Sequence, residues 1–99
     1  MRIMVKVTIP VEAGNAAFKD GRLGKTFAAF VDQFRPESSY FFPEGGKRNA
    51  LFVIDLKDST QVPVVAERFF VELGAAVEMT PAMTYDELQK GLQHASGSK

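Results

Sequence analysis

The chain has 99 residues, of which 45% are hydrophobic and 24% are charged, and this length suits one modest hydrophobic core. Twelve basic and twelve acidic residues cancel, so no overall field attracts nucleic acid or an anionic membrane. Cysteine is absent, which excludes disulfides, thiolate metal sites and thiol catalysis. We recognise neither a signal peptide nor a membrane span, and we expect a cytoplasmic protein.

The first pattern is an alternation of apolar and other residues from Arg2 to Ile9. Alternation with β-branched residues is typical of a strand that is packed on one side, and Pro10 cannot continue its ladder. The predicted strand has two faces, which are Ile3, Val5, Val7 and Ile9 on one side and Met4, Lys6 and Thr8 on the other.

Between Val11 and Gly21 we expect a short helical turn that starts at Gly14-Asn15 and runs to Lys19, after which Asp20-Gly21 breaks it. A helix is predicted from Leu23 to Phe34, and Pro36 follows it. Its apolar stripe consists of Leu23, Phe27, Phe30, Val31 and Phe34.

Two extended runs then meet at a Gly-Gly turn, Ser39 to Phe42 and Asn49 to Leu56. The second run is apolar on both faces, as is typical of a central strand that is covered on both sides. Because the second face also needs a cover, we expect a partner subunit there.

A second helix is predicted from Val62 to Leu73, with Gly74 just past its end. Its apolar stripe consists of Val62, Val65, Ala66, Phe69, Phe70 and Leu73. A last strand from Ala75 to Thr80 follows, and Thr84 and Glu87 form a capping box that opens a short C-terminal helix anchored by Leu88 and Leu92. We expect one domain over residues 1–93 and a disordered tail over residues 94–99.

The element order is β-α-β-β-α-β, which predicts an α+β fold of the ferredoxin-like type with an antiparallel sheet. This fold hosts many unrelated functions, so the order leaves the chemistry open. A mixed sheet face with Met4, Lys6 and Thr8, joined by Leu51, Val53, Asp55 and Glu78, is too apolar for open solvent, and a second copy of the chain would cover it.

Five short motifs occur along the chain. They are Ile9-Pro10-Val11-Glu12-Ala13-Gly14-Asn15, Asp20-Gly21-x-Leu23-Gly24-Lys25, Tyr40-Phe41, Gly46-Lys47-Arg48 and Val77-Glu78-x-x-Pro81-x-Met83-Thr84. Together they resemble a family of small, uncharacterised bacterial proteins of the dimeric α/β barrel superfamily, and the resemblance covers nearly the whole chain up to the tail. It implies a homodimer in which two ferredoxin-like sheets enclose a barrel interior, and superfamily relatives include cofactor-free monooxygenases, lactone isomerases and haem-degrading enzymes.

Two features that suggest well-known chemistry have simpler interpretations. Gly24-Lys25-Thr26 looks like the end of a phosphate-binding loop, but that motif requires a glycine where Lys19 stands, so we expect a close-packed Gly24 in a helix. His94 is the only histidine and falls in the predicted tail, where no catalytic geometry is held. We therefore expect no metal and no cofactor.

The remaining candidates for a site are charged and aromatic residues. Lys6 and Glu78 are candidate catalytic groups, because charges on a covered face must be paired or must contact a ligand; a structural ion pair is the simpler alternative. The candidate ligand-binding residues are Asn15, Tyr40, Arg48 and Asp55, with Phe42 beside them. Arg48 would steer a carboxylate if the aromatic residues line a pocket.

Three functions remain open. The first is binding of a small molecule between the sheet and the helices. The second is a cofactor-independent oxygenase or isomerase acting on a small aromatic or carbonyl substrate, in which Lys6 or Glu78 titrates while Tyr40 or Arg48 orients the substrate. The third is a structural or regulatory module that assembles through its sheet face. An enzyme needs a cavity that reaches a titratable group, whereas a binder needs only an apolar cavity.

Overall fold

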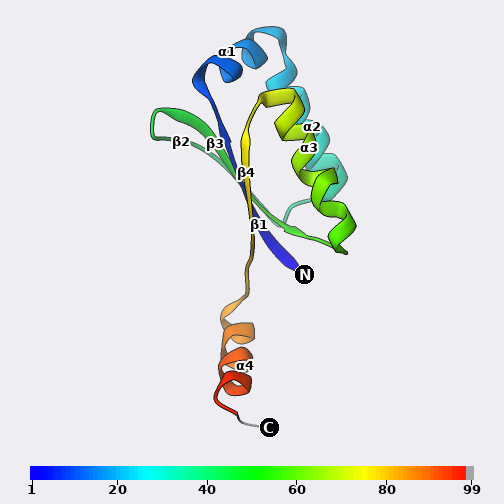
Figure 1. Ribbon diagram of the computed structural model, residues 1–99, viewed down its shortest axis with the longest axis vertical. Coiled ribbons are helices and arrows are strands. Elements are labelled where there is room, and N and C mark those ends of the chain that lie inside the picture. The colour runs from blue at the N-terminus through cyan, green and yellow to red at the C-terminus, as the bar shows by residue number, and fades with distance from the viewer. Residues whose placement is uncertain (98–99) are drawn as a thin grey trace.

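The computed structural model describes residues 1–97 and has the α+β class that the sequence predicts (Figure 1). An open antiparallel sheet of four strands is accompanied by four α-helices within these residues. A short 3-10 helix, Ser59–Gln61, precedes α3. The elements are β1 (Arg2–Ile9), α1 (Val11–Asp20), α2 (Arg22–Phe34), β2 (Ser38–Glu44), β3 (Lys47–Asp55), α3 (Val62–Leu73), β4 (Ala76–Pro81) and α4 (Tyr85–Ala95).

The strands lie in the order β2-β3-β1-β4, and every neighbouring pair is antiparallel. The two central strands are therefore β1 and β3, with Val5 of β1 opposite Phe52 of β3 and Met79 of β4. This arrangement is compatible with a ferredoxin-like fold. The β2–β3 turn is made by Gly45 and Gly46, whose φ angles of 61° and 74° belong to the left-handed region that glycine adopts without strain.

The connection between β1 and β2 contains two helices, and the first begins earlier than predicted. A turn starting at Gly14-Asn15 was wrong, because α1 already begins at Val11 and the Gly14 amide donates to the Pro10 carbonyl over 2.8 Å. Pro10 stands at the N-cap with no side-chain cap, so the local sequence carries no Ser, Thr, Asp or Asn signal for this start. Gly21, with φ 85°, ends α1 and lets the chain enter α2 in a new direction.

The core lies between one face of the sheet and helices α1, α2 and α3. The predicted inner face of β1 is confirmed, since all four of its members are buried. They pack with Phe30 of α2, Phe52 of β3 and Phe69 of α3, which are fully buried. The prediction that Val62 and Phe70 belong to the buried stripe of α3 was wrong, because both are exposed. Val31, at the edge of the apolar stripe of α2, is exposed as well. Within residues 1–97 no other element covers the outer sides of these two helices.

The opposite face of the sheet has no helix over it in the described part of the chain. We call it the open face; it consists of Met4, Lys6, Thr8, Tyr40, Phe42, Asn49, Leu51, Val53, Glu78 and Thr80. Lys6 lies between Leu51 and Glu78, and Met4 lies between Val53 and Thr80. Leu51 and Val53 are half-buried, although they stand on a central strand. The predicted division of β1 and β3 between two faces is therefore confirmed.

Helix α4 stands beyond the end of the sheet, at the opposite end of the molecule from α1 (Figure 1). The predicted capping box is confirmed: the Glu87 amide donates to Thr84 Oγ1 over 3.2 Å, and the Thr84 amide donates to Glu87 Oε1 over 2.7 Å. Every residue of α4 is exposed. The helix includes His94 and Ala95, which the sequence assigns to a tail over residues 94–99; residues 98 and 99 of that tail lie outside the described residues.

Candidate functional site

A groove of about 1020 Å³ opens between helices α1 and α2 and the β2–β3 hairpin. Its lining comes from five elements, β1, α1, α2, β2 and β3, and most of it is apolar. One end carries the polar groups, because Asn15, Lys47, Arg48 and Asn49 gather where the hairpin passes α1. The apolar part of the lining consists of Ile9, Val11, Phe18, Leu23, Phe27, Phe41, Phe42 and Pro43.

Aromatic rings form much of the apolar lining and connect it to the core. Phe27 of α2 and Phe41 of β2 meet edge to face, with ring centroids 5.1 Å apart. Both rings also contact Phe52 of β3, with centroid distances of 6.0 Å from Phe27 and 5.7 Å from Phe41. Because Phe52 is fully buried, the floor of the groove is packed directly on the core. Phe41 remains 56% exposed and Phe18 remains 67% exposed, so the groove presents apolar surface to solvent. Such a concave apolar surface is typical of a ligand-binding site.

Arg48 marks the polar end of the groove. Its Nη1 donates to Asn15 Oδ1 over 3.2 Å, and its guanidinium lies 6.0 Å from the centroid of the Phe18 ring. Among residues 1–97, neither Arg48 nor the neighbouring Lys47 forms an ion pair with a carboxylate. The guanidinium is thus held by a neutral amide and an aromatic ring, and its charge is available to an anion.

Two glycines shape the groove in opposite ways. Gly14 of α1 lies under Arg48, because a Cβ added there would stand 2.7 Å from Arg48 Nη1 and 3.1 Å from Ile9 Cγ2. Gly24 of α2 faces open space, since an added Cβ would meet no atom within 4 Å. The predicted close packing of Gly24 was therefore wrong: it lines the groove, and no neighbouring element approaches it.

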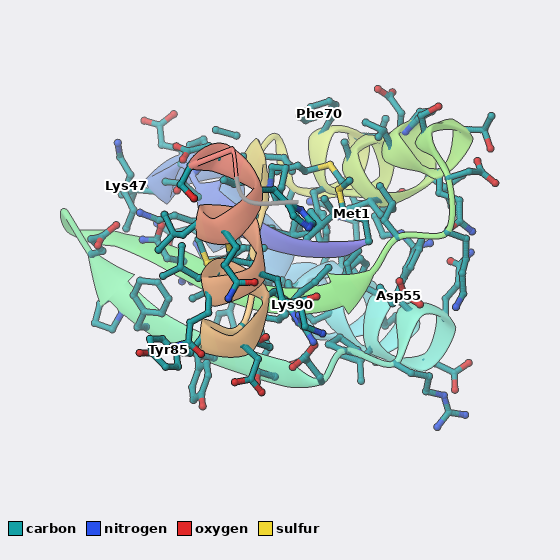
Figure 2. The ribbon with its side chains drawn as sticks, turned by 90° about the horizontal axis from the view of Figure 1, so that it is seen from below. Met1, Lys47, Asp55, Phe70, Tyr85 and Lys90 are labelled. Atoms are coloured by element: carbon teal, nitrogen blue, oxygen red, sulfur yellow. The ribbon has the colours of Figure 1, made fainter. Side chains whose placement is uncertain are left out.

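Of the ligand-binding candidates that the sequence suggests, Asn15 and Arg48 come together in the groove. Phe42 belongs to the lining, although strand alternation puts it on the open face, in register with Asn49. Tyr40 also lies on the open face, opposite Leu51, and is 63% exposed. Asp55 lies at the far end of β3 from Lys47, as Figure 2 shows, and pairs with the Met1 amino group at 3.1 Å and with Lys57 Nζ at 2.6 Å. The Lys57 hydrogen bond, followed by that of the N-terminus, lowers the pKa of Asp55.

The catalytic candidates Lys6 and Glu78 are neighbours on the open face and do not line the groove. Lys6 Nζ donates to Glu44 Oε1 over 2.5 Å, and this hydrogen bond raises the pKa of Lys6. Glu78, which is exposed, adds a smaller attraction to the same ammonium group. Lys6 therefore belongs to a structural ion pair, which is the simpler of the two interpretations.

The structure also places the Gly24-Lys25-Thr26 motif and the single histidine, His94. Neither lies in a loop that joins a strand to a helix, where a phosphate-binding loop would be found. Gly24, Lys25 and Thr26 lie in the first turns of α2, with Thr26 buried. His94 is exposed in the last turn of α4. Among the described residues no three His, Cys, Asp or Glu side chains gather in a group that could hold a metal ion. Across the same residues, every helix is too short or too polar to span a membrane.

Sequence reasoning missed several residues of the groove, namely Phe18, Phe41, Lys47 and Gly24. A signal exists for one of them, because Phe18 is the single aromatic residue in an otherwise small and polar stretch. Lys47 and Phe41 gave no signal of this kind, because their place in the groove depends on how the β2–β3 hairpin packs against α1 and α2.

No protein-family model matches the chain, and no curated protein matches it. The resemblance to a bacterial family therefore rests on the sequence motifs alone.

Proposed function

We propose that the chain binds a small molecule in the groove between α1, α2 and the β2–β3 hairpin. The observation that carries this proposal is the Arg48 guanidinium at one end of an apolar groove, with no carboxylate partner among the described residues. The ligand that fits this chemistry has an apolar or aromatic body and one anionic group, such as a carboxylate.

The two parts of such a ligand would be recognised separately. Its body covers the exposed rings of Phe18 and Phe41, and apolar burial contributes roughly 25 cal/mol for each Å² removed from water. Its anionic group pairs with Arg48, and a hydrogen bond to a charged group contributes about 1.5–3 kcal/mol. Asn15 holds the guanidinium in place before the ligand arrives, which reduces the ordering that binding requires.

Binding without catalysis is favoured by the composition of the lining. No Asp, Glu, His or Tyr belongs to it, so a general base of ordinary pKa is missing from the described walls of the groove. The alternative of a cofactor-independent oxygenase or isomerase relies on Lys6 and Glu78, which belong to the open face. We therefore place the binding hypothesis ahead of the enzyme and of the structural module.

We also propose that the fold is ferredoxin-like and that the chain forms a homodimer through its open face. Leu51, Val53 and Met4 support this, because they leave apolar side chains on an uncovered side of the two central strands. A twofold axis would give the open face of each copy the same cover from its partner.

The binding proposal is tested with two fluorescent probes that share an aromatic body. Anilinonaphthalenesulfonate carries an anionic group, and phenylnaphthylamine lacks it. We expect both probes to bind the folded chain, with the anionic probe binding at least tenfold more tightly. Arg48→Gln should remove about tenfold or more of the affinity for the anionic probe and leave that of the neutral probe nearly unchanged.

The matched control is Lys90→Gln, which removes an exposed cation on α4, the helix at the opposite end of the molecule from α1 (Figure 1). A second variant, Gly24→Leu, should block both probes, because its side chain extends into the open space of the groove without meeting a neighbour. Equal loss of affinity for the anionic probe in Arg48→Gln and Lys90→Gln, or unchanged binding of both probes to Gly24→Leu, would contradict the proposal.

A further inference from the structure

The chain exposes more surface than a compact monomer of its mass. Its accessible surface is 6519 Å², whereas a compact chain of 10.9 kDa exposes roughly 5,600 Å². Its radius of gyration is 15.9 Å, against about 13 Å for a compact domain of this length. The excess surface of about 900 Å² is close to the roughly 800 Å² that each partner contributes to a standard protein interface.

Helix α4 is one source of this excess. In Figure 1 it extends the molecule along its longest axis, and the principal extents are 56, 28 and 18 Å. The helix is tied to the domain by its polar side, because Glu87 Oε1 accepts a hydrogen bond from Arg2 Nη1 at 2.7 Å. No side chain of α4 is buried.

Helix α4 is amphipathic, and its apolar residues lie on one side. At 100° per residue, Tyr85, Leu88, Leu92 and Ala95 fall on one stripe. The charged residues Asp86, Glu87 and Lys90 and the imidazole of His94 fall on the other side. If a partner covered this apolar stripe, no charged side chain would be buried or would need a new ion-pair partner. Leu88 and Leu92 are nevertheless 39% and 58% exposed, so the stripe lacks a partner within the described chain.

The open face is the second source of the excess, and its dimensions suit α4. Four strands at a spacing of about 4.8 Å make a sheet roughly 15 Å wide. A helix of 11 residues is about 16 Å long and so crosses such a sheet once. The middle of the open face offers Leu51, Val53 and Met4 to an apolar stripe. Lys6 of this face is already paired with Glu44, and Glu78 lies on the edge strand β4, where it is exposed.

We infer that α4 is an exchanged arm, which lays its apolar stripe across the open face of a second copy of this chain. This inference rests on the proposed homodimer and adds which segment fills its interface. Each copy supplies one arm and one open face, so a twofold dimer covers both arms and both faces and leaves neither to recruit a third copy. The ion pair of Arg2 with Glu87 stays on the polar side and directs the arm away from its own sheet.

The arm is tested by crosslinking, for which the absence of cysteine in the chain is an advantage. One tagged chain carries Gln89→Cys, beside the apolar stripe, and an untagged chain carries Thr80→Cys on the open face. After the two are mixed and treated with a short bismaleimide, we expect a tagged–untagged adduct. The matched control is Lys90→Cys, the next residue along α4 but on its charged side, which should give several-fold less adduct with Thr80→Cys.

The second measurement is the molar mass in solution. The unaltered chain should be a dimer at micromolar concentration, and Leu88→Gln with Leu92→Gln should weaken the dimer at least tenfold. The pair Lys90→Gln with His94→Gln changes the same helix on its other side and should leave the dimer intact. Circular dichroism should show that all variants keep their fold, since none of these side chains is buried.

The outcomes separate this inference from the proposals it rests on. A dimer without the preferential adduct, or one that survives Leu88→Gln with Leu92→Gln, overturns the arm and leaves the homodimer standing. A monomer overturns both. If both cysteines in one chain give only an intramolecular adduct, the helix folds back on its own sheet and the exchange is wrong. Probe binding is a separate measurement, because the groove shares only Phe42 and Asn49 with the open face and none of these variants alters a residue of its lining.

Discussion

A Cβ atom at Gly14 would lie only 2.7 Å from Nη1 of Arg48, so the arginine lies across α1 at the one position where the helix has no side chain. We predict that Gly14→Ala moves the guanidinium away from Asn15 and weakens binding of the anionic probe several-fold. The unfolding free energy should change by less than about 1 kcal/mol, because the higher helix propensity of alanine offsets the crowding against Ile9.

The measurement is a titration of both probes together with chemical denaturation. Gly91→Ala is the control, because it adds the same methyl group to a helix where no atom lies within 4 Å. If Gly14→Ala binds the anionic probe with unchanged affinity, the position of the Arg48 guanidinium does not determine how the anion is recognised.

The core prediction compares two phenylalanines. Phe52 is fully buried, and its ring lies 4.6 Å from that of Phe30 and 6.2 Å from that of Phe69, measured between centroids. Phe52→Ala should lower the unfolding free energy by about 3–5 kcal/mol, since it removes apolar contacts and leaves a cavity. Phe70→Ala, at a side chain 43% exposed, should cost less than about 1.5 kcal/mol. Denaturant titration measures both, and similar losses in the two variants would contradict the assigned core.

Much of this fold could be predicted from local patterns. The period of two in β1 decides which residues face the helices, and Gly45 with Gly46 fixes the β2–β3 hairpin and its register. Thr84 and Glu87 mark the start of α4, because their spacing allows both hydrogen bonds of a capping box.

The groove could not be predicted in the same way. Phe18 and Arg48 approach each other only because α1 packs near the start of β3, which no local pattern encodes. The partner of Lys6 was missed for a similar reason: Glu78 is its cross-strand neighbour, but Glu44 reaches it from an edge strand two strands away. The start of α1 was missed because Pro10 caps it without a side-chain hydrogen bond.

The third prediction compares two glycines, one in the left-handed region of φ and the other inside a helix. Gly74 ends α3 with φ 58°, and an added Cβ would lie 3.4 Å from the Cβ of Ala13. Gly74→Ala should destabilise the chain by about 1–2 kcal/mol, because an L side chain is strained in the left-handed region. Gly24→Ala, inside α2 with free space around it, should raise the stability by up to about 1 kcal/mol. Thermal unfolding of the two variants should therefore shift in opposite directions, and shifts of the same sign would refute the assignment.

The last prediction concerns pH and the capping box of α4. The hydrogen bonds from Thr84, aided by Arg2, lower the pKa of Glu87 below its ordinary value of 4.5. A carboxyl with a lowered pKa in the folded state stabilises that state above its ordinary pKa, and this contribution is lost as the pH falls through the lowered value. We expect the amide signals of α4 in an NMR titration to lose their helical shifts below pH 4.5, while those of the sheet persist. Glu87→Gln keeps an acceptor at the cap but cannot titrate, so its α4 signals should not follow this transition. A Glu87 carboxyl that titrates at or above its ordinary value would show that the capping box and the Arg2 pair do not hold α4 in solution.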